Sequence, residues 1–196
     1  MIRRSRISEI SPRTDFRTRW VATYKFSDKL SIENNFTLRE AEYSASDFAN
    51  RVRSNAATAT YAMSDKFSVF GGFVYDNFLA TSAVTFLRGT APLSAAWRDH
   101  VINRVWQGGV EARPIAPLEF RISGDYLRTT GVGEISGELP ISGPLRWPLV
   151  TATTSIRVPR AGVLSIDLQR TYYTEEIMRG DNFSANILGV RWTREF

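Results

Sequence analysis

The chain lacks cysteine altogether, has one histidine among 196 residues, and contains no long hydrophobic run. Without cysteine there is no disulfide framework, no thiolate metal site and no cysteine nucleophile. No segment approaches the ~18 consecutive apolar residues that a transmembrane helix requires. The sequence therefore excludes a helical membrane protein and a disulfide-stapled scaffold.

Signals for catalysis, metals and nucleic acid are also poor. His100 follows Asp99, but no serine lies in a recognisable nucleophile elbow, so we expect no enzyme activity. The acids Glu175, Glu176 and Asp181 do not have the spacing of a calcium loop, and we expect neither metal nor cofactor. The formal charge of +5 comes from scattered Lys and Arg residues. A nucleic-acid partner would need them clustered, and none is expected.

What the chain does have is an alternation of apolar and polar residues with period two. In the segment 16–26, Phe16, Trp20, Tyr24 and Phe26 share one parity, and charged or polar residues share the other. The same alternation occurs in 30–39, with Asn34 as an exception on the apolar side, and in 118–126 and 164–172. Period two predicts β-strands that separate an apolar face from a polar one.

Turn-forming residues divide the chain into about nine strands. We predict strands at 14–26, 30–43, 51–63, 66–81, 99–113, 117–130, 147–158, 162–174 and 183–196. Short turns are expected at 27–29, 64–65, 114–116 and 159–161, after every second strand. The intervening connections are longer, notably 82–98 and 131–146, both of which contain Gly and Pro. Short turns at one end and long loops at the other are typical of an outer-membrane barrel.

An internal repeat supports this division: Tyr24–Ile32, with the turn Ser-Asp-Lys, returns as Tyr61–Val69. The repeat unit is a β-hairpin. Residues 1–13 lack the apolar core of a signal peptide, and we expect them to form a loop or terminal segment. We expect residues 14–196 to form a single domain of barrel strands.

The predicted fold class is all-β, an antiparallel up-and-down transmembrane β-barrel with about nine to ten strands in this chain. The mean hydropathy of −0.22 and the 12% of aromatic residues fit strands that are apolar on alternate positions. Single-chain bacterial barrels usually have an even number of strands, so nine suggests the C-terminal part of a larger barrel. A tenth short strand in 6–12 is the alternative.

The polar parity gathers charged residues on one side of the sheet, which we expect to face the lumen, because Arg or Lys facing lipid at the midplane costs roughly 2–4 kcal/mol. The expected lumen-facing residues are Arg17, Arg19, Lys25, Glu33, Arg39, Arg53, Glu111, Arg113, Glu119, Arg121, Asp125, Asp167 and Arg191. Basic residues exceed acidic ones in this set, which favours a hydrated pathway with a mild anion preference or a surface that holds an inserted partner. Cross-strand ion pairing that fills the interior is the simpler interpretation. Arg104, Arg170 and Arg194 fall on the apolar parity and should lie near the membrane interfaces.

The carboxyl end carries the strongest resemblance. Leu188, Val190, Trp192 and Phe196 alternate with polar residues, and the chain stops on the aromatic Phe196. A terminal Phe closing an alternating strand resembles the C-terminal assembly signal of bacterial outer-membrane β-barrels. The resemblance implies a bacterial outer-membrane location, with outer-membrane lipid and the barrel assembly machinery as partners.

A second resemblance concerns the hairpins. The tight polar turn followed by Leu-Ser-Ile in 30–32 or Phe-Ser-Val in 67–69 is similar to hairpins of the large decaheme-cytochrome-associated barrels of the MtrB/PioB type. That family implies a barrel that houses an electron-transfer cytochrome, here a periplasmic or lumen-inserted partner protein. The chain itself contains no Cys-x-x-Cys-His heme attachment motif, and no functional residue is carried over.

The expected function is therefore passive passage of solutes, or housing of a partner, across the outer membrane. Two alternatives remain open. One is a soluble antiparallel β-barrel or sandwich that acts as a binding module with its apolar side inward. The other is an outer-membrane hydrolase that uses His100. The sequence leaves the solute or partner, the total strand number, the pore width and the oligomeric state undetermined.

Overall fold

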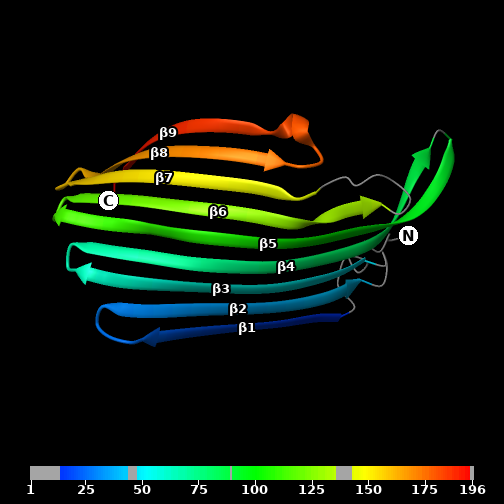
Figure 1. Ribbon diagram of the computed structural model, residues 1–196, viewed down its shortest axis with the longest axis horizontal. Helices are drawn as coiled ribbons and strands as arrows, with labels where there is room; N and C mark the ends of the chain where they lie inside the picture. The colour runs from blue at the N-terminus through cyan, green and yellow to red at the C-terminus, as the bar shows by residue number, and fades with distance from the viewer. Residues whose placement is uncertain (1–13, 44–47, 89, 136–142, 195–196) are drawn as a thin grey trace, which may run out of the picture.

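The computed structural model describes residues 14–43, 48–88, 90–135 and 143–194, with the side chains of 86–88 not described. These residues form one antiparallel sheet in which every strand pairs with its neighbours in chain order (Figure 1). The strands are β1 (Thr14–Lys25), β2 (Leu30–Tyr43), β3 (Phe48–Ser64), β4 (Phe67–Arg88), β5 (Ala91–Ile115), β6 (Leu118–Ile135), β7 (Leu145–Val158), β8 (Gly162–Glu175) and β9 (Phe183–Thr193), and a single 3₁₀ turn, η2 (Arg179–Asp181), precedes β9.

The antiparallel, up-and-down arrangement of nine strands is confirmed. The four predicted short turns are present, each within two residues of its expected place, and all lie at one end of the sheet, where β9 also ends (Figure 1). We call this the turn end and the opposite one the loop end. The segment 1–13, predicted as a loop or terminal segment with a short strand at 6–12 as the alternative, and the terminal Phe196 lie outside the described residues.

One predicted loop is wrong. Residues 82–98 were expected to form a long connection, but β4 and β5 continue through them as a paired hairpin, from Ser82 opposite Trp97 to Arg88 opposite Ala91. The expectation rested on Gly89 and Pro92. Pro92 follows the first residue of β5, where a missing N–H disturbs the sheet least, and the remaining residues are mostly small or β-branched. Similarly, β6 extends to Ile135, past the expected start of its loop.

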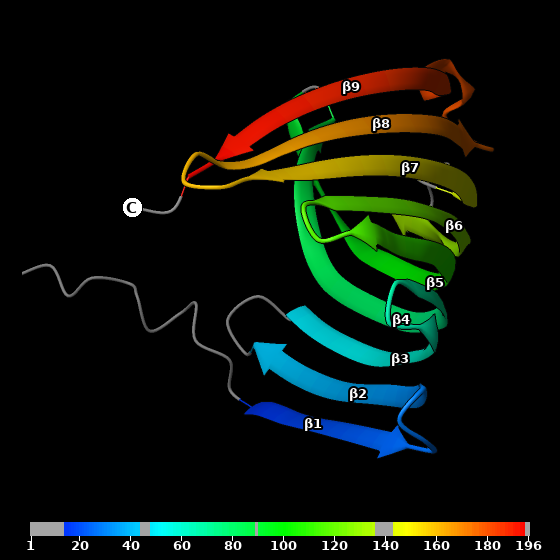
Figure 2. The ribbon, with the colours of Figure 1, turned by 90° about the vertical axis from the view of Figure 1, so that its left-hand side faces the viewer.

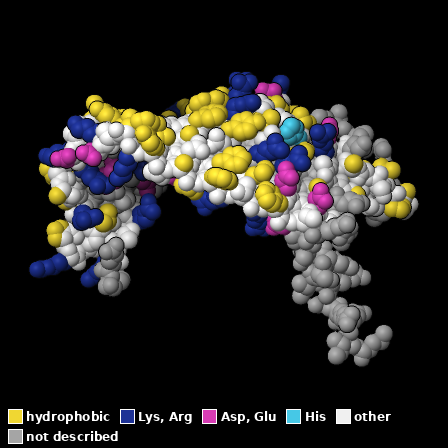
Figure 3. All heavy atoms as spheres, turned by 90° about the horizontal axis from the view of Figure 1, so that it is seen from below, with side chains coloured by type: hydrophobic (Ala, Val, Ile, Leu, Met, Phe, Trp, Pro, Cys, Tyr) yellow, Lys and Arg dark blue, Asp and Glu magenta, His cyan; other side chains and the backbone are white. Residues whose placement is uncertain are grey.

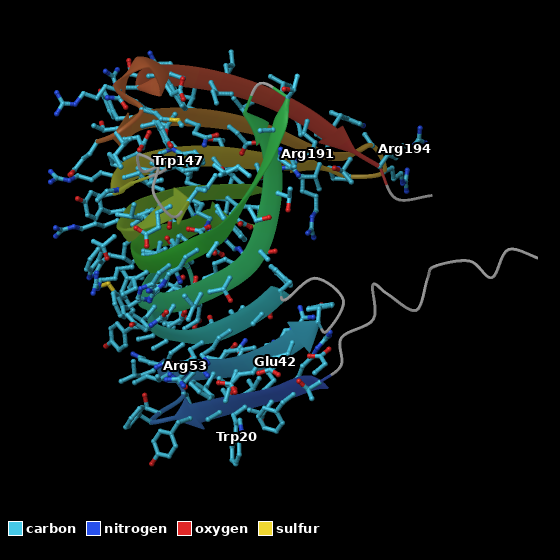
Figure 4. All side chains as sticks on the ribbon, turned by 90° about the vertical axis from the view of Figure 1, so that its right-hand side faces the viewer. Trp20, Glu42, Arg53, Trp147, Arg191 and Arg194 are labelled. Atoms are coloured by element: carbon cyan, nitrogen blue, oxygen red, sulfur yellow. The ribbon has the colours of Figure 1, made fainter. Side chains whose placement is uncertain are left out.

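The sheet is strongly curved and open, so that it has a convex and a concave face (Figure 2). Directly paired residues share a face, so the register assigns every strand residue to one of them. The row Trp20, Phe36, Asn55 and Tyr75 lies on one face, and Asp167 and Arg191 come close on the other. Trp20 points away from the hollow and Arg191 points into it (Figure 4). The first face is therefore convex and the second concave.

The described residues have almost no hydrophobic core. Only Ala41 and Ala80 are buried hydrophobic residues, while large apolar side chains along the convex face stay exposed, such as Trp20 at 69% and Val190 at 68%. On β8 the convex-facing apolar stretch runs from Leu164 to Tyr172, and on β6 from Leu118 to Tyr126. Each covers about the 9–11 residues that a strand needs to cross a bilayer. Hydrophobic side chains follow this outer side and give way to charged ones toward the loop end (Figure 3).

No helix in the described part of the chain has the length and apolar character needed to cross a bilayer.

The sheet ends in two unpaired edges, β1 and β9. Because every neighbouring pair is antiparallel, these two strands run in the same direction. Direct pairing of the edges would therefore be parallel. A closed barrel that is antiparallel throughout needs an odd number of further strands between them.

Candidate functional site on the concave face

The concave face carries polar side chains over the half of the sheet nearest the turn end. Serine, threonine and carboxylate groups line up across β7 and β8, where Thr153 donates to Asp167 at 2.7 Å and Ser155 lies 2.9 Å from Ser165. Arg191 of β9 approaches Asp167 at 3.6 Å. Thr153, Ser155, Asp167 and Arg191 border an open hollow that also includes Glu119 and Arg121. Over β6–β9 the surface can therefore hydrogen-bond water or polar solutes.

The register places nearly all of the predicted lumen residues on this face. Those on it are Arg17, Arg19, Lys25, Glu33, Arg39, Glu111, Glu119, Arg121, Asp125, Asp167 and Arg191, and Arg113, at a register shift, lies beside them through its contacts with Glu111 and Glu119.

Arg53 is the exception and the prediction for it is wrong. It pairs with Leu38, which pairs with Thr18, and both share the face of Trp20, so Arg53 is convex. In β3 neither parity is consistently apolar, since small and polar residues occupy both. The pattern of that strand alone therefore could not assign its faces.

Ion pairs hold several of the concave charges. Asp15 accepts from Arg17 at 2.6 Å and from Arg39 at 3.4 Å. At the turn end of β5 and β6, Arg113 lies 2.9 Å from Glu111 and 3.0 Å from Glu119. Such exposed pairs contribute little to stability, typically about 0–1 kcal/mol each. They do fix where positive and negative charge lie along the surface.

The charge balance of the concave face differs from the sequence expectation. The predicted set was mainly basic. Among residues with described side chains, the register adds four acids that this set omitted, namely Asp15, Asp76, Asp99 and Glu175, and one base, Arg157. Acidic and basic groups on the described concave face therefore nearly cancel. An anion preference of this surface does not follow from its charge.

Toward the loop end the character of the faces changes from strand to strand. The concave face of β7–β9 becomes apolar and aromatic there, with ring centroids 5.8 Å apart for Trp147 and Tyr173 and 5.4 Å apart for Tyr173 and Phe183, while Asp15 and Asp99 keep it charged on β1 and β5. On the convex face near the loop end of β2 and β3 lie Arg51 and Glu40, joined at 2.7 Å. The region in which the outside is apolar and the inside polar is thus limited to a band next to the turn end.

Two of the apolar-face exceptions noted in the sequence, Asn34 and Arg170, have local partners. Asn34 donates to Asn55 across β2 and β3 at 2.9 Å, so each amide meets part of the other's hydrogen-bonding need. Arg170 stacks over the ring of Tyr172 at 4.9 Å and hydrogen-bonds Asn186 at 3.4 Å. Both arrangements reduce the cost of a polar group on an apolar surface.

His100 and the acidic loop have structural contacts. His100 lies on the convex face opposite Leu79, whereas the adjacent Asp99 belongs to the concave face. The imidazole Nε2 lies 3.3 Å from Asn77 Oδ1. The Glu175 carboxylate accepts from the backbone N–H groups of Ile177 and Met178 and so caps its own loop. No group of three His, Asp or Glu residues suited to a metal occurs among the described residues.

The described part of the predicted C-terminal signal lies on the edge strand β9. Leu188, Val190 and Trp192 share the convex face, opposite Leu168, Ile166 and Leu164, and are more than half exposed. Because β9 is paired on one side only, its other edge offers free backbone groups to a further strand.

The comparisons with known proteins found no matching family model, no similar curated protein and no similar solved structure.

Proposed function

We propose that this sheet forms part of the wall of a transmembrane β-barrel in the bacterial outer membrane, which provides a passage or sheath across it. One observation carries the proposal: where the convex face has an exposed apolar band, the opposite, concave face of the sheet is polar. Large apolar groups in water cost free energy of about 25 cal/mol per Å². Lipid around the outside would remove that cost, and a hydrated interior would keep the polar groups solvated.

Curvature supports a membrane over a soluble sandwich or barrel. In a soluble closed barrel the apolar side chains would fill the inside of the curve. Here they lie on the outside, and no second sheet covers them in the described residues (Figure 2). The aromatic residues Phe73, Trp106 and Tyr126 lie near one border of the band, and Trp192 lies near the other. Aromatic belts of this kind are typical of membrane interfaces.

The orientation and partners follow from the same proposal. Short turns belong on the periplasmic side and long loops outside. The apolar band contacts outer-membrane lipid. The barrel assembly machinery recognises β9 together with Phe196, which follows it in the sequence. Further strands close the barrel between β1 and β9.

The natural absence of cysteine allows a direct test. Leu168→Cys and Gln169→Cys would place single thiols on neighbouring residues of β8 that face opposite sides. In cells, we expect a lipophilic maleimide to label Leu168→Cys and a small water-soluble thiol reagent to label Gln169→Cys. Labelling of both by the water-soluble reagent, or fractionation of the unaltered protein away from the outer membrane, would contradict the proposal.

Housing of a partner protein is a second candidate, favoured by the aromatic group formed by Trp147, Tyr173 and Phe183 on the concave face. Apolar rings that line the inside of a hydrated barrel would gain stability from an inserted protein. A sheath should conduct poorly while its partner is bound and co-purify with it. An open channel should instead conduct ions after purification alone.

A further inference from the structure

Among the described residues, the convex face of β4–β9 carries a net positive charge toward the loop end. Across β4–β9 the described convex positions hold one acid, Glu134, and several arginines, namely Arg98, Arg104, Arg128, Arg146 and Arg170. All of them except Arg170, which lies within the apolar stretch of β8, lie at or beyond the border of the apolar band. The sequence pattern had assigned the basic excess to the opposite face.

Three of these arginines form a continuous row. Arg104 lies directly opposite Arg128, and Arg128 lies directly opposite Arg146 on the next strand. Cβ atoms of directly paired residues are only about 4.5–5.5 Å apart, and like charges placed so destabilise a sheet. Two such pairs in succession predict an anion that neutralises the row.

Protein groups neutralise the row only in part. Arg146 approaches Glu176 at 3.8 Å, with both side chains more than half exposed. Arg104 donates to Thr130 at 3.3 Å and stacks near Tyr75 at 5.9 Å. Among the described residues no carboxylate forms an ion pair with Arg104 or Arg128. Their guanidinium groups keep donors for an external oxyanion.

The position of the row identifies that anion. One register step toward the apolar band lies a row of aromatic rings, with Phe73 and Trp106 at 5.4 Å and Trp106 and Tyr126 at 5.7 Å. If the apolar band contacts acyl chains, these rings lie at the headgroup boundary and the arginines lie among the headgroups. Arg binds phosphate oxygens in bidentate geometry.

We propose that Arg104, Arg128 and Arg146 form a binding site for the phosphate groups of a phosphorylated lipid of the outer leaflet. The inference rests on the proposed membrane function. It adds a specific lipid contact that the barrel architecture does not require. The site would fix the depth and rotation of this side of the wall in the bilayer.

The test compares two variants that each remove two arginines from the convex face. R104Q/R128Q removes arginines without a described acidic partner, whereas R51Q/R53Q removes arginines that lie 2.7 Å and 3.8 Å from Glu40. Full-length protein extracted from the outer membrane is titrated with lipid A, with phosphatidylcholine and with inorganic phosphate. Bound lipid is counted by native mass spectrometry.

We expect wild type to retain lipid A in preference to phosphatidylcholine, and R104Q/R128Q to bind it about thirtyfold more weakly, because each arginine near an anionic headgroup contributes about fivefold. R51Q/R53Q should lose less than about threefold, and the wild-type affinity should fall with added salt. Unchanged binding by R104Q/R128Q, or an equal loss in both variants, would overturn the site.

Further outcomes of the test distinguish failure of the lipid site from failure of the proposed membrane function. Displacement of lipid A by inorganic phosphate at a similar concentration would assign the row to free phosphate and overturn the lipid proposal. Both variants should remain in the outer membrane. Absence of the wild-type protein from that membrane would refute the proposed function and this inference together, whereas a wild-type protein that is in the membrane but shows no preference for lipid A would refute only the inference.

Discussion

Placing an arginine on Ile122 tests whether the convex face contacts lipid. Ile122 is on β6, near the middle of the apolar stretch from Leu118 to Tyr126, and its side chain is 53% exposed. Its cross-strand partners are Val110 and Ala152, so no acidic group is directly opposite. We expect Ile122→Arg to destabilise the sheet strongly in a bilayer.

The magnitude follows from two terms. An arginine at the bilayer midplane costs roughly 2–4 kcal/mol. Loss of the isoleucine side chain adds about 1 kcal/mol. Complete burial of such a side chain stabilises by ~1.5–3 kcal/mol, and we take half of that value because Ile122 is half exposed. The expected total of about 3–5 kcal/mol is a large share of the ~5–15 kcal/mol that stabilises a typical domain.

The neighbouring residue provides a matched control. Ser123 lies on the concave face opposite Gly109 and Thr151 and borders the polar hollow. Ser123→Arg should change the free energy of unfolding by no more than about 0.5 kcal/mol, as for other solvated surface sites. Ile122→Ala should fall between the two arginine variants.

The assay is urea unfolding of the protein in phosphatidylcholine vesicles, followed by tryptophan fluorescence and gel mobility without heating. The reasoning would be refuted by a larger loss for Ser123→Arg than for Ile122→Arg. That result would put the hydrated surface on the convex side and the covered surface on the concave one.

Further substitutions test individual elements of the structure. Asn55→Leu should cost about 1–3 kcal/mol by leaving the Asn34 amide unpaired on the apolar face, while replacement of both by Leu should recover most of the loss in a double-mutant cycle. Gly162→Ala should lower stability by at least about 1–3 kcal/mol in equilibrium unfolding, because φ is +117° and the added Cβ would strike the backbone of Thr193. Arg113→Gln should leave stability nearly unchanged but shift the reversal potential in planar bilayers toward cation selectivity, because it leaves Glu111 and Glu119 without their shared partner. Deletion of Phe196 should reduce assembly in cells more than refolding in detergent, which a pulse-chase of heat-modifiable protein would show; equal losses in both would count against an assembly signal.

The amino-acid sequence determined the strands and most of their faces. Period-two alternation is a local property, because successive side chains in an extended chain point to opposite sides. It located β1, β2 and β8 closely, and the start of β6, since each has one clearly apolar parity. Turn residues such as Ser27 and Pro159 then marked the short hairpin connections.

Only the tertiary structure decided what depends on pairing between strands. Arg53 lies in a strand with no clear apolar parity, so its face follows from its register with Leu38 and not from its neighbours in sequence. The extension of β4 and β5 through 82–98 required the two strands to pair with each other. The arginine row of Arg104, Arg128 and Arg146 combines residues from three strands, and no local pattern brings them together. The direction of curvature, which puts the apolar face outside, is a property of the whole sheet and of no single strand (Figure 2).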